Sequence, residues 1–294
     1  MEILQIKKEL LGTPVGKSND KIFLNSSKHY SLSIYNKENK LLQTIDNFYC
    51  HNVYTSKDKI ILSGFQIKQN FFRIGTILFL DKTLQITEVR NIKNYFSEIL
   101  WSDGIVCCAN TFKPEQSIMN GEILTVENFK KIKLPTMLLG EYEFRGGIKH
   151  LQEYYFYGVD KDNYRGVIVK LKNNKTEFIE TEIKSELWQF SGIETYKNNI
   201  ILAGNKWENV GFKGFIMVLT QDNYQKLFDI PITSSWFETV NIKRIHNKLL
   251  ISVFDFDSNE GILFEFNSGE FKILEKTYNS NYFLSDESIF VKSN

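Results

Sequence analysis

The sequence predicts an all-β chain, and three observations support this prediction. Aromatic residues make up 14 % of the 294 residues, whereas the chain contains only 4 Pro. Short apolar segments rich in Ile, Val, Phe and Tyr recur along the whole chain, separated by polar residues typical of turns. No long segment has the i, i+3, i+4 apolar spacing of an amphipathic helix. Because β-branched and aromatic side chains favour strands, we expect many short strands joined by turns.

An apolar strand of similar sequence recurs at intervals of about 40 to 50 residues, which indicates a repeated unit of structure. Its copies are Lys21–Leu24, Lys59–Gly64, Gly104–Ala109, Tyr154–Gly158, Asn199–Gly204, Lys248–Ser252 and Ser288–Val291. A second strand follows each of the first six copies, at Tyr30–Tyr35, Gly75–Leu80, Gly121–Val126, Gly166–Leu171, Gly214–Leu219 and Gly261–Phe266. A third follows a polar turn, at Leu41–Ile45, Leu84–Val89, Phe129–Leu134, Glu177–Ile183, Lys226–Ile230 and Phe271–Glu275.

A segment that opens on aromatic residues precedes the recurring strand in most units. These segments are Phe48–Tyr54, Tyr95–Trp101, Tyr142–Ile148, Leu187–Ile193 and Trp236–Ile242. Each unit therefore contains four strands, called A to D in chain order, which is the strand count and length of a β-propeller blade. A two-sheet sandwich is the competing all-β fold, but it does not predict the same strand order in every unit.

The two ends of the chain predict how the repeat is closed. Tyr282–Ser285 and Ile289–Lys292 resemble strands A and B of a seventh unit, and Ile3–Ile6 resembles a C or D strand. Sharing one blade between the termini removes open sheet edges, which all-β proteins avoid. We therefore predict one propeller domain over residues 1–294, with seven blades and a thin seventh; six blades remain the alternative.

The units resemble a family of bacterial propeller repeats, in which an Ile-Ile-Leu-Ala-Gly strand precedes a Gly-led apolar strand and an Asp/Asn-rich turn. Asn199–Gly204 followed by Gly214–Asn223 fits this pattern best, and the Gly-His and Trp-Asp signatures of WD40 repeats are missing. The resemblance implies a fold and no functional residue, since propellers host enzymes and scaffolds alike.

Composition narrows the class of function. The 36 basic and 35 acidic residues nearly balance, which argues against binding nucleic acid. No apolar run approaches the about 20 residues that span a bilayer, and the N-terminus does not resemble a secretory signal, so we expect a cytoplasmic protein with no membrane contact. Cys50, Cys107 and Cys108 form no disulfide or metal-binding pattern and are expected to be buried thiols. No cofactor is expected.

The links between strands predict which end of each unit is functional. The A–B and C–D links are short and polar, whereas several B–C links are longer and contain aromatic residues. Long loops on a rigid scaffold commonly carry binding residues. We therefore expect exposed partner-binding side chains in the B–C loops at Trp207, Phe212, Phe71, Phe72 and Phe112, with Trp207 as the main anchor. Trp188 and Trp236 open A strands and either bind the partner or pack between blades.

Two patterns of polar residues resemble a catalytic site and a metal-binding site. His51, Glu98 and Glu238 each lie two residues after a blade-opening aromatic residue, where two carboxylates about 5–9 Å apart could act as an acid/base pair. Hydrogen-bonded polar residues are the alternative. Asp255, Asp257 and Asn259 resemble the start of a calcium loop, but Glu260 and Phe266 depart from that pattern, so calcium is not expected.

The sequence thus favours a non-enzymatic cytoplasmic scaffold that binds another protein through its long-loop end, with a toxin-neutralising immunity protein of bacteria as the specific candidate. A hydrolase or lyase that uses channel-mouth carboxylates is one alternative. Binding of a sugar or small ligand by the aromatic residues is the other.

Overall fold

The computed structural model describes residues 3–5, 12–18, 20–26, 30–68, 72–93, 96–113, 118–135, 141–220, 224–284 and 289–293. The described residues contain strands and no helix. The chain divides into two compact units. Unit 1 comprises residues 1–10, 157–169 and 178–294, and unit 2 comprises residues 11–156 and 170–177. Each unit is described separately below.

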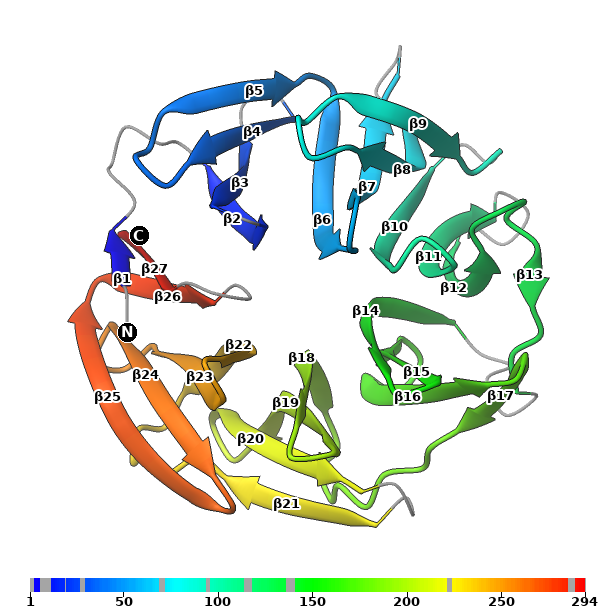
Figure 1. Ribbon diagram of the computed structural model, residues 1–294. Helices are drawn as coiled ribbons and strands as arrows, with labels where there is room; N and C mark the ends of the chain where they lie inside the picture. The colour runs from blue at the N-terminus through cyan, green and yellow to red at the C-terminus, as the bar shows by residue number, and fades with distance from the viewer. Residues whose placement is uncertain are drawn as a thin grey trace. The chain divides into compact units, whose positions relative to one another are not determined.

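Within the described residues, six successive four-stranded sheets confirm the predicted repeat (Figure 1). In unit 2 the strands are β2 (Thr13–Ser18), β3 (Lys21–Ser26), β4 (Ser31–Asn36), β5 (Leu41–Ile45), β6 (Phe48–Thr55), β7 (Ile60–Ile67), β8 (Arg73–Leu80), β9 (Ile86–Asn91), β10 (Ser97–Ser102), β11 (Val106–Lys113), β12 (Ile118–Thr125) and β13 (Lys131–Ile132). The next sheet contains β14 (Tyr142–His150), β15 (Glu153–Asp160), β16 (Arg165–Lys172) and β17 (Lys175–Phe178). In unit 1 the strands are β18 (Trp188–Tyr196), β19 (Asn199–Glu208), β20 (Gly211–Leu219), β21 (Gln225–Asp229), β22 (Phe237–Ile245), β23 (Lys248–Asp255), β24 (Glu260–Asn267) and β25 (Glu270–Tyr278).

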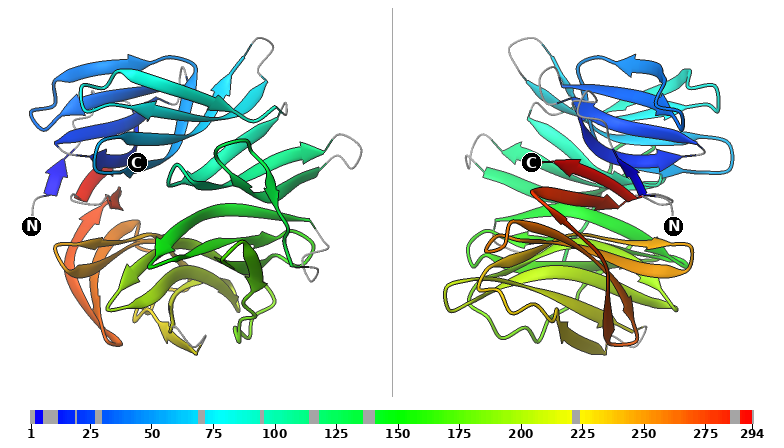
Figure 2. Two further views of the ribbon diagram at one scale, coloured as in Figure 1. Left: turned by 45° about the vertical axis from the view of Figure 1, so that its right-hand side comes forward. Right: turned by 90° about the vertical axis from the view of Figure 1, so that its left-hand side faces the viewer.

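Burial within a sheet follows strand position. The B strands, such as β7 and β23, are buried along nearly their whole length, because both of their faces carry apolar side chains. The D strand β25 is mostly exposed and forms the outer edge of its sheet, which is visible in the side views of Figure 2. The apolar core therefore lies mainly on the B and C strands. The A strands bury alternate side chains in it, such as Phe48 and Phe237, so that their other side chains and the links remain available for function.

Three strands show differences from the sequence prediction that have a clear local cause or consequence. The first A strand, Thr13–Ser18, was not predicted because it contains Pro14 and Gly16 and lacks an opening aromatic residue. Strand β13 has only two residues, fewer than expected for the D position. Strand β17 begins at Lys175, earlier than predicted, because Asn173 and Asn174 both have positive φ and complete a two-residue turn.

A β-bulge recurs in the A strands β2, β6, β10, β18 and β22. In β6 the bulge lies between Cys50 and Asn52, so that His51 is the extra residue. A bulge redirects the side chain at which it occurs and is common beside functional sites. The bulge therefore breaks the simple alternation from which the facing of His51 was predicted.

Buried asparagines connect alternate sheets to the sheet that follows. Asn25 accepts from the Cys50 amide at 2.9 Å and donates to its carbonyl at 2.6 Å. Asn110 accepts from the Phe144 amide at 2.9 Å and donates to the Phe144 carbonyl at 3.0 Å. Asn205 accepts from the Thr239 amide at 2.7 Å and donates to the Thr239 carbonyl at 3.3 Å. These asparagine bridges satisfy backbone groups that buried strands would otherwise leave unpaired. Each of the three bridges joins a different pair of neighbouring sheets.

The two ends of the chain form a three-stranded sheet. Strand β1 (Ile3–Gln5) pairs with β27 (Ile289–Ser293), which pairs with β26 (Ser280–Leu284), as the neighbouring blue and red strands in Figures 1 and 2 show. The predicted sharing of one sheet by the termini is confirmed. The β1–β27 pairing is parallel, whereas the pairs within the other sheets are antiparallel wherever the register is described.

Deleting Met1–Lys8 should lower the thermal midpoint by at least about 3 °C, because β27 would lose its pairing with β1 and become an open edge of the sheet. Differential scanning calorimetry measures the change. Deleting Met1 and Glu2 alone leaves β1 in place and serves as the control. A midpoint of the longer deletion within a degree of the control would contradict the role of β1.

Candidate functional site

Two of the predicted polar residues come together in unit 2. Glu98 lies on β10 and His51 at the bulge of β6, and the His51 Nε2 atom is 3.2 Å from Glu98 Oε2. Asn110, which faces Glu98 across the β10–β11 ladder, donates to Glu98 Oε1 at 3.3 Å. The side chains of His51 and Glu98 are each about one-fifth exposed. The pair therefore lies at an accessible but partly desolvated position.

Aromatic rings surround the imidazole of this pair. The Tyr49 ring meets the His51 ring edge-on at 5.3 Å and stacks on Phe65 with centroids 5.3 Å apart. The Arg73 guanidinium lies 4.9 Å from the centre of the Phe65 ring. The cluster thus combines a carboxylate, an imidazole, a guanidinium and two stacked rings.

The balance of forces on Glu98 keeps its carboxyl group ionised. Burial alone raises its pKa, but hydrogen bonds from His51 and Asn110, together with the charges of His51 and Arg73, outweigh burial and lower the pKa below the ordinary 4.5. A general acid needs the opposite shift. The arrangement suits an anion that orients a partner group better than a proton donor.

Replacing Glu98 with Gln should make the protein less stable near neutral pH by about 1 kcal/mol, because a partly buried charged hydrogen bond is lost. Since folding lowers the pKa of Glu98, this contribution is fully present above the unfolded value near 4.5 and disappears as pH falls through the lower folded value. Chemical denaturation of both proteins between pH 6 and pH 3 tests this. A difference that stays constant across the range would contradict it.

Glu238 occupies the position on β22 that Glu98 occupies on β10, because each is the second residue of its strand and precedes the bulge by the same spacing. Its Oε1 atom accepts a hydrogen bond from Trp236 Nε1 at 2.9 Å. Glu98 belongs to unit 2 and Glu238 to unit 1. Their action as an acid/base pair therefore stays a prediction.

The oxygens of the calcium-like segment are used by the protein itself. Asp255 Oδ2 accepts from the hydroxyls of Ser234 and Ser258, at 2.5 Å and 2.8 Å. Asp257 Oδ2 accepts from the amide and hydroxyl of Ser235, which lower the pKa of Asp257. Asn259 has positive φ and donates to Asn279 Oδ1 at 3.3 Å. No metal-binding cluster of His, Cys, Asp or Glu occurs within the described part of the chain.

The exposed aromatic side chains gather at one end of their sheets. We call the end with the B–C and D–A links the loop end, and the end with the A–B and C–D links the turn end. The described residues include seven exposed aromatic side chains. Six lie at the loop end: Tyr30, Phe96, Tyr164, Trp236, Phe256 and Tyr278. The seventh, Tyr224, lies at the turn end of unit 1.

Trp207 lies on a strand, which corrects its predicted position in a loop. Strands β19 and β20 continue to Glu208 and Gly211, so only Asn209 and Val210 form the link. Trp207 faces Phe212 across the ladder, and their rings meet edge-on at 5.2 Å. Both side chains are half-buried. Trp207 therefore contributes to packing as well as to the loop-end surface.

Trp236 and Phe256 form the most exposed aromatic pair in unit 1. Their side chains are 39 % and 49 % exposed, with ring centroids 5.4 Å apart. Phe256 also meets Phe254 edge-on at 5.0 Å. A Cβ atom on Gly211 would lie 2.9 Å from the Trp236 Cβ, so the start of β20 packs directly against Trp236. The pair is thus joined to the Trp207–Phe212 hairpin.

The remaining predicted aromatic residues divide between core and surface. Trp188 is only 4 % exposed and packs over Gly166, where a Cβ would lie 2.3 Å from its ring, so its side chain has the packing role that was one of its two predicted roles. Phe72 and Phe112 each contact Phe96, at 5.0 Å and 5.7 Å, and Phe112 lies on β11, not in a loop as predicted. Phe71 lies outside the described residues.

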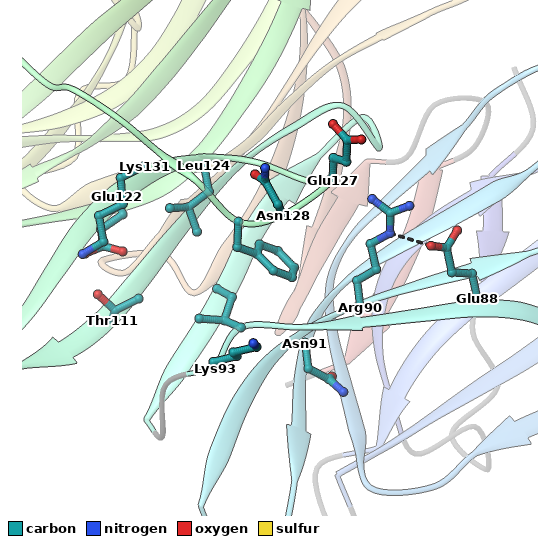
Figure 3. A pocket seen from close by; sticks show the side chains of 12 residues that line it. Glu88, Arg90, Asn91, Lys93, Thr111, Glu122, Leu124, Glu127, Asn128 and Lys131 are labelled. Carbon is teal, nitrogen blue, oxygen red and sulfur yellow. Dashed lines mark hydrogen bonds and ion pairs between the residues drawn. The ribbon is translucent and has the colours of Figure 1, made fainter.

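A groove of about 750 Å³ lies in unit 2, between β9 and β12–β13 (Figure 3). Glu88, Glu122 and Glu127 line it together with Arg90, Lys93 and Lys131. Arg90 donates to Glu88 at 2.6 Å, as the dashed line in Figure 3 marks, and Lys131 pairs with Glu122. With its charges balanced and largely paired, the groove favours neither anions nor cations.

The three cysteines are free and buried, as predicted. Burial raises the pKa of the Cys50, Cys107 and Cys108 thiols, which keeps them protonated and unreactive. No described helix is long and apolar enough to cross a membrane.

Similarity to known proteins is confined to the fold. No family model matches the chain, and no curated protein sequence is similar to it. The β-propeller domain of Cps50 (Swd1) from Myceliophteria thermophila matches with a TM-score of 0.62 at 7 % identity, over 95 % of this chain and 90 % of that one. The propeller domain of the Trilobed protease from Pyrococcus furiosus matches with a TM-score of 0.56 at 14 % identity, over 91 % and 84 %. Streptogramin B lyase matches with a TM-score of 0.56 at 13 % identity, over 95 % and 86 %.

These similarities show an all-β propeller fold, as the sequence predicts. The part of the chain that the structure describes contains six complete four-stranded blades and the three-stranded sheet of the termini. The neighbours include a lyase and part of a protease, so the fold is compatible with a binding scaffold without excluding an enzyme. The resemblance to bacterial propeller repeats extends to the fold and no further.

Proposed function

We propose that this protein is a scaffold that binds another protein through the loop end of unit 1. The contact surface consists of Leu187, Trp207, Val210, Phe212, Trp236 and Phe256, and we call it the unit 1 loop-end surface. The observation that carries the proposal is the placement of six of the seven exposed aromatic side chains at loop ends. Aromatic anchors dominate binding energy at protein interfaces.

The unit 1 loop-end surface is held in place by its own backbone contacts. The Trp207 amide donates to the Leu187 carbonyl at 2.8 Å, and the Phe256 amide donates to the Trp236 carbonyl at 3.1 Å. Asp257 accepts hydrogen bonds from the Ser235 amide and hydroxyl beside Trp236. A preorganised aromatic surface loses little entropy when a partner binds, which favours tight association.

Within this class, we propose a cytoplasmic toxin as the partner, so that the protein would act as a bacterial immunity protein. A surface of exposed rings suits capping of a folded partner better than recognition of a polyanion, since the chain has a net charge of +1. Co-expression with the product of an adjacent gene would test this identity. If the captured partner is not toxic, the proposed scaffold function still holds, but the proposed role as an immunity protein is wrong.

Catalysis by Glu98 and Glu238 is the alternative that the geometry supports less. Glu98 has a lowered pKa, which is unfavourable for a general acid, and Glu238 already accepts a hydrogen bond from Trp236. Binding of a sugar by the aromatic rings is the remaining alternative. Turnover on a glycan or lactone panel that disappears in Glu238→Gln would overturn the scaffold proposal in favour of an enzyme.

Affinity capture from the native lysate tests the proposed function. The wild-type chain, the Trp236→Ala/Phe256→Ala variant and the Tyr224→Ala variant are used as baits, and bound proteins are quantified by mass spectrometry. We expect one partner to be recovered by the wild type and by Tyr224→Ala, and lost with Trp236→Ala/Phe256→Ala. Equal recovery by all three baits would contradict the assignment of the surface.

A further inference from the structure

A second cavity lies at the turn end of unit 1, where no function was expected from the sequence. Its volume is about 190 Å³, and it lies between the sheet of β18–β21 and the sheet of β22–β25. The first sheet contributes the end of β18 and parts of β19, β20 and β21, and the second contributes β24 and the link that follows it. The cavity is therefore built from two neighbouring blades.

Three aromatic rings form the walls of this cavity: Tyr196, Phe228 and Phe266. Phe266 is almost completely buried, whereas Tyr196 and Phe228 are half-buried. Phe228 meets Phe266 edge-on with centroids 5.3 Å apart, and its ring is also held by Gly269, where a Cβ would lie only 2.6 Å away. Fixed rings of this kind favour a flat apolar ligand.

Two lysines line the same cavity. Lys226 Nζ lies 4.9 Å from the centre of the Phe228 ring, and Lys197 Nζ lies 5.3 Å from the centre of the Tyr196 ring. Lys197 Nζ also donates to Asn267 Oδ1 at 2.7 Å and to Ser268 Oγ at 3.3 Å. These acceptors are neutral, so they position the ammonium group without cancelling its charge. An ammonium group has three donors, and one remains for a ligand.

No carboxylate is among the described residues that line the cavity. The cavity therefore presents two positive charges beside aromatic walls and offers no internal counterion. Its volume is below the roughly 300 Å³ of pockets for drug-sized ligands, which limits the ligand to about one ring. We propose that this cavity binds a small planar carboxylate that carries a single aromatic ring. The ring packs against Tyr196 and Phe228, and the carboxylate accepts hydrogen bonds from Lys197 and Lys226.

This site is independent of the proposed protein-binding function, since it lies at the turn end and shares no residue with the unit 1 loop-end surface. Benzoate is a suitable probe because it has one ring and one carboxylate. Benzamide has the same shape without the charge, and acetate has the charge without the ring. The comparison of these three compounds separates the contributions of ring and charge.

Titration of the protein with benzoate, followed by backbone amide resonances, tests the proposal. We expect saturable shifts at Lys197, Asn199, Ser268 and Gly269, with a dissociation constant on the order of 1 mM. Benzamide and acetate should bind at least about tenfold more weakly. The Lys197→Gln/Lys226→Gln variant should weaken benzoate binding by about tenfold. Lys272→Gln removes an exposed lysine of β25 that does not line the cavity, and it should leave binding unchanged.

Three results would overturn the proposal. They are an absence of shifts at about ten times the expected dissociation constant, equal affinity for benzamide and benzoate, and unchanged benzoate affinity in Lys197→Gln/Lys226→Gln. Because both substitutions are at exposed side chains, the circular dichroism spectrum of this variant should match that of the parent. If it does not, Lys226→Gln alone replaces it, with an expected loss of about threefold.

Discussion

Replacing Asn205 with Leu should lower the free energy of unfolding by about 3 kcal/mol, the largest stability effect among the substitutions that we propose. Asn205 is 2 % exposed, and its side chain is bonded to the amide and the carbonyl of Thr239 on the neighbouring sheet. Leucine has nearly the same size but can neither donate nor accept. Both backbone groups of Thr239 would then stay buried without a partner, at a cost of about 1–3 kcal/mol each.

Asn163→Leu is the matched control in the same unit. Asn163 is exposed, and its amide donates only to Asp160 within the same turn, at 3.0 Å. This substitution should change the free energy of unfolding by no more than about 0.5 kcal/mol. Urea denaturation of both variants measures the difference. If Asn205→Leu were as stable as Asn163→Leu, the asparagine bridges would not be what joins these sheets.

Replacing Trp236 with Ala should weaken binding of the captured partner about thirty-fold, which corresponds to about 2 kcal/mol. The Trp236 side chain is 39 % exposed and contacts Phe256 on the same surface. Truncation removes a large, partly exposed ring from the unit 1 loop-end surface. The packing of Gly211 against the Trp236 Cβ is retained in alanine, so stability should change by less than about 1 kcal/mol. Calorimetric titration with the purified partner gives both affinities.

Tyr224→Ala is the control for this measurement, because Tyr224 is the exposed aromatic residue at the opposite end of unit 1. It should leave affinity and stability unchanged. Trp207→Ala should weaken binding, but less than Trp236→Ala does. It should also lower stability by about 1 kcal/mol, since its ring packs edge-on against Phe212. A loss of binding in Tyr224→Ala with none in Trp236→Ala would place the interface at the turn end.

The repeat of four strands could be predicted because the B and C strands are apolar on both faces and recur at a regular interval. The loops were harder to predict, and the segment around Trp207 shows why. Lys206 and Glu208 made this segment resemble a polar loop, yet Lys206 is 8 % exposed on β19 and pairs with Glu208 at 2.7 Å and with Asp229 at 2.8 Å. Paired charges fit within a strand, but one of these pairs depends on Asp229 of β21, which lies beyond β20 in the same sheet and which sequence spacing does not reveal.

The candidate polar site was predicted in its residues but not in its geometry. Alternation along strand A grouped His51 with Glu98 and Glu238 as equivalent positions. The bulge at His51 breaks this alternation, and the residue of β6 that corresponds to Glu98 is Tyr49. The bulge brings the His51 imidazole to Glu98 on the next sheet. The lysine and aromatic cavity was also missed, since its lining residues come from two blades and are far apart in the sequence.

Hydrogen–deuterium exchange of the chain, free and bound to its captured partner, tests the central claim most directly. The proposal predicts slower exchange on binding in residues 205–212 and 234–257, which carry the unit 1 loop-end surface, and no change in residues 224–228 at the turn end. Slower exchange confined to residues 196–199 and 224–228, with the loop-end segments unchanged, would contradict the account.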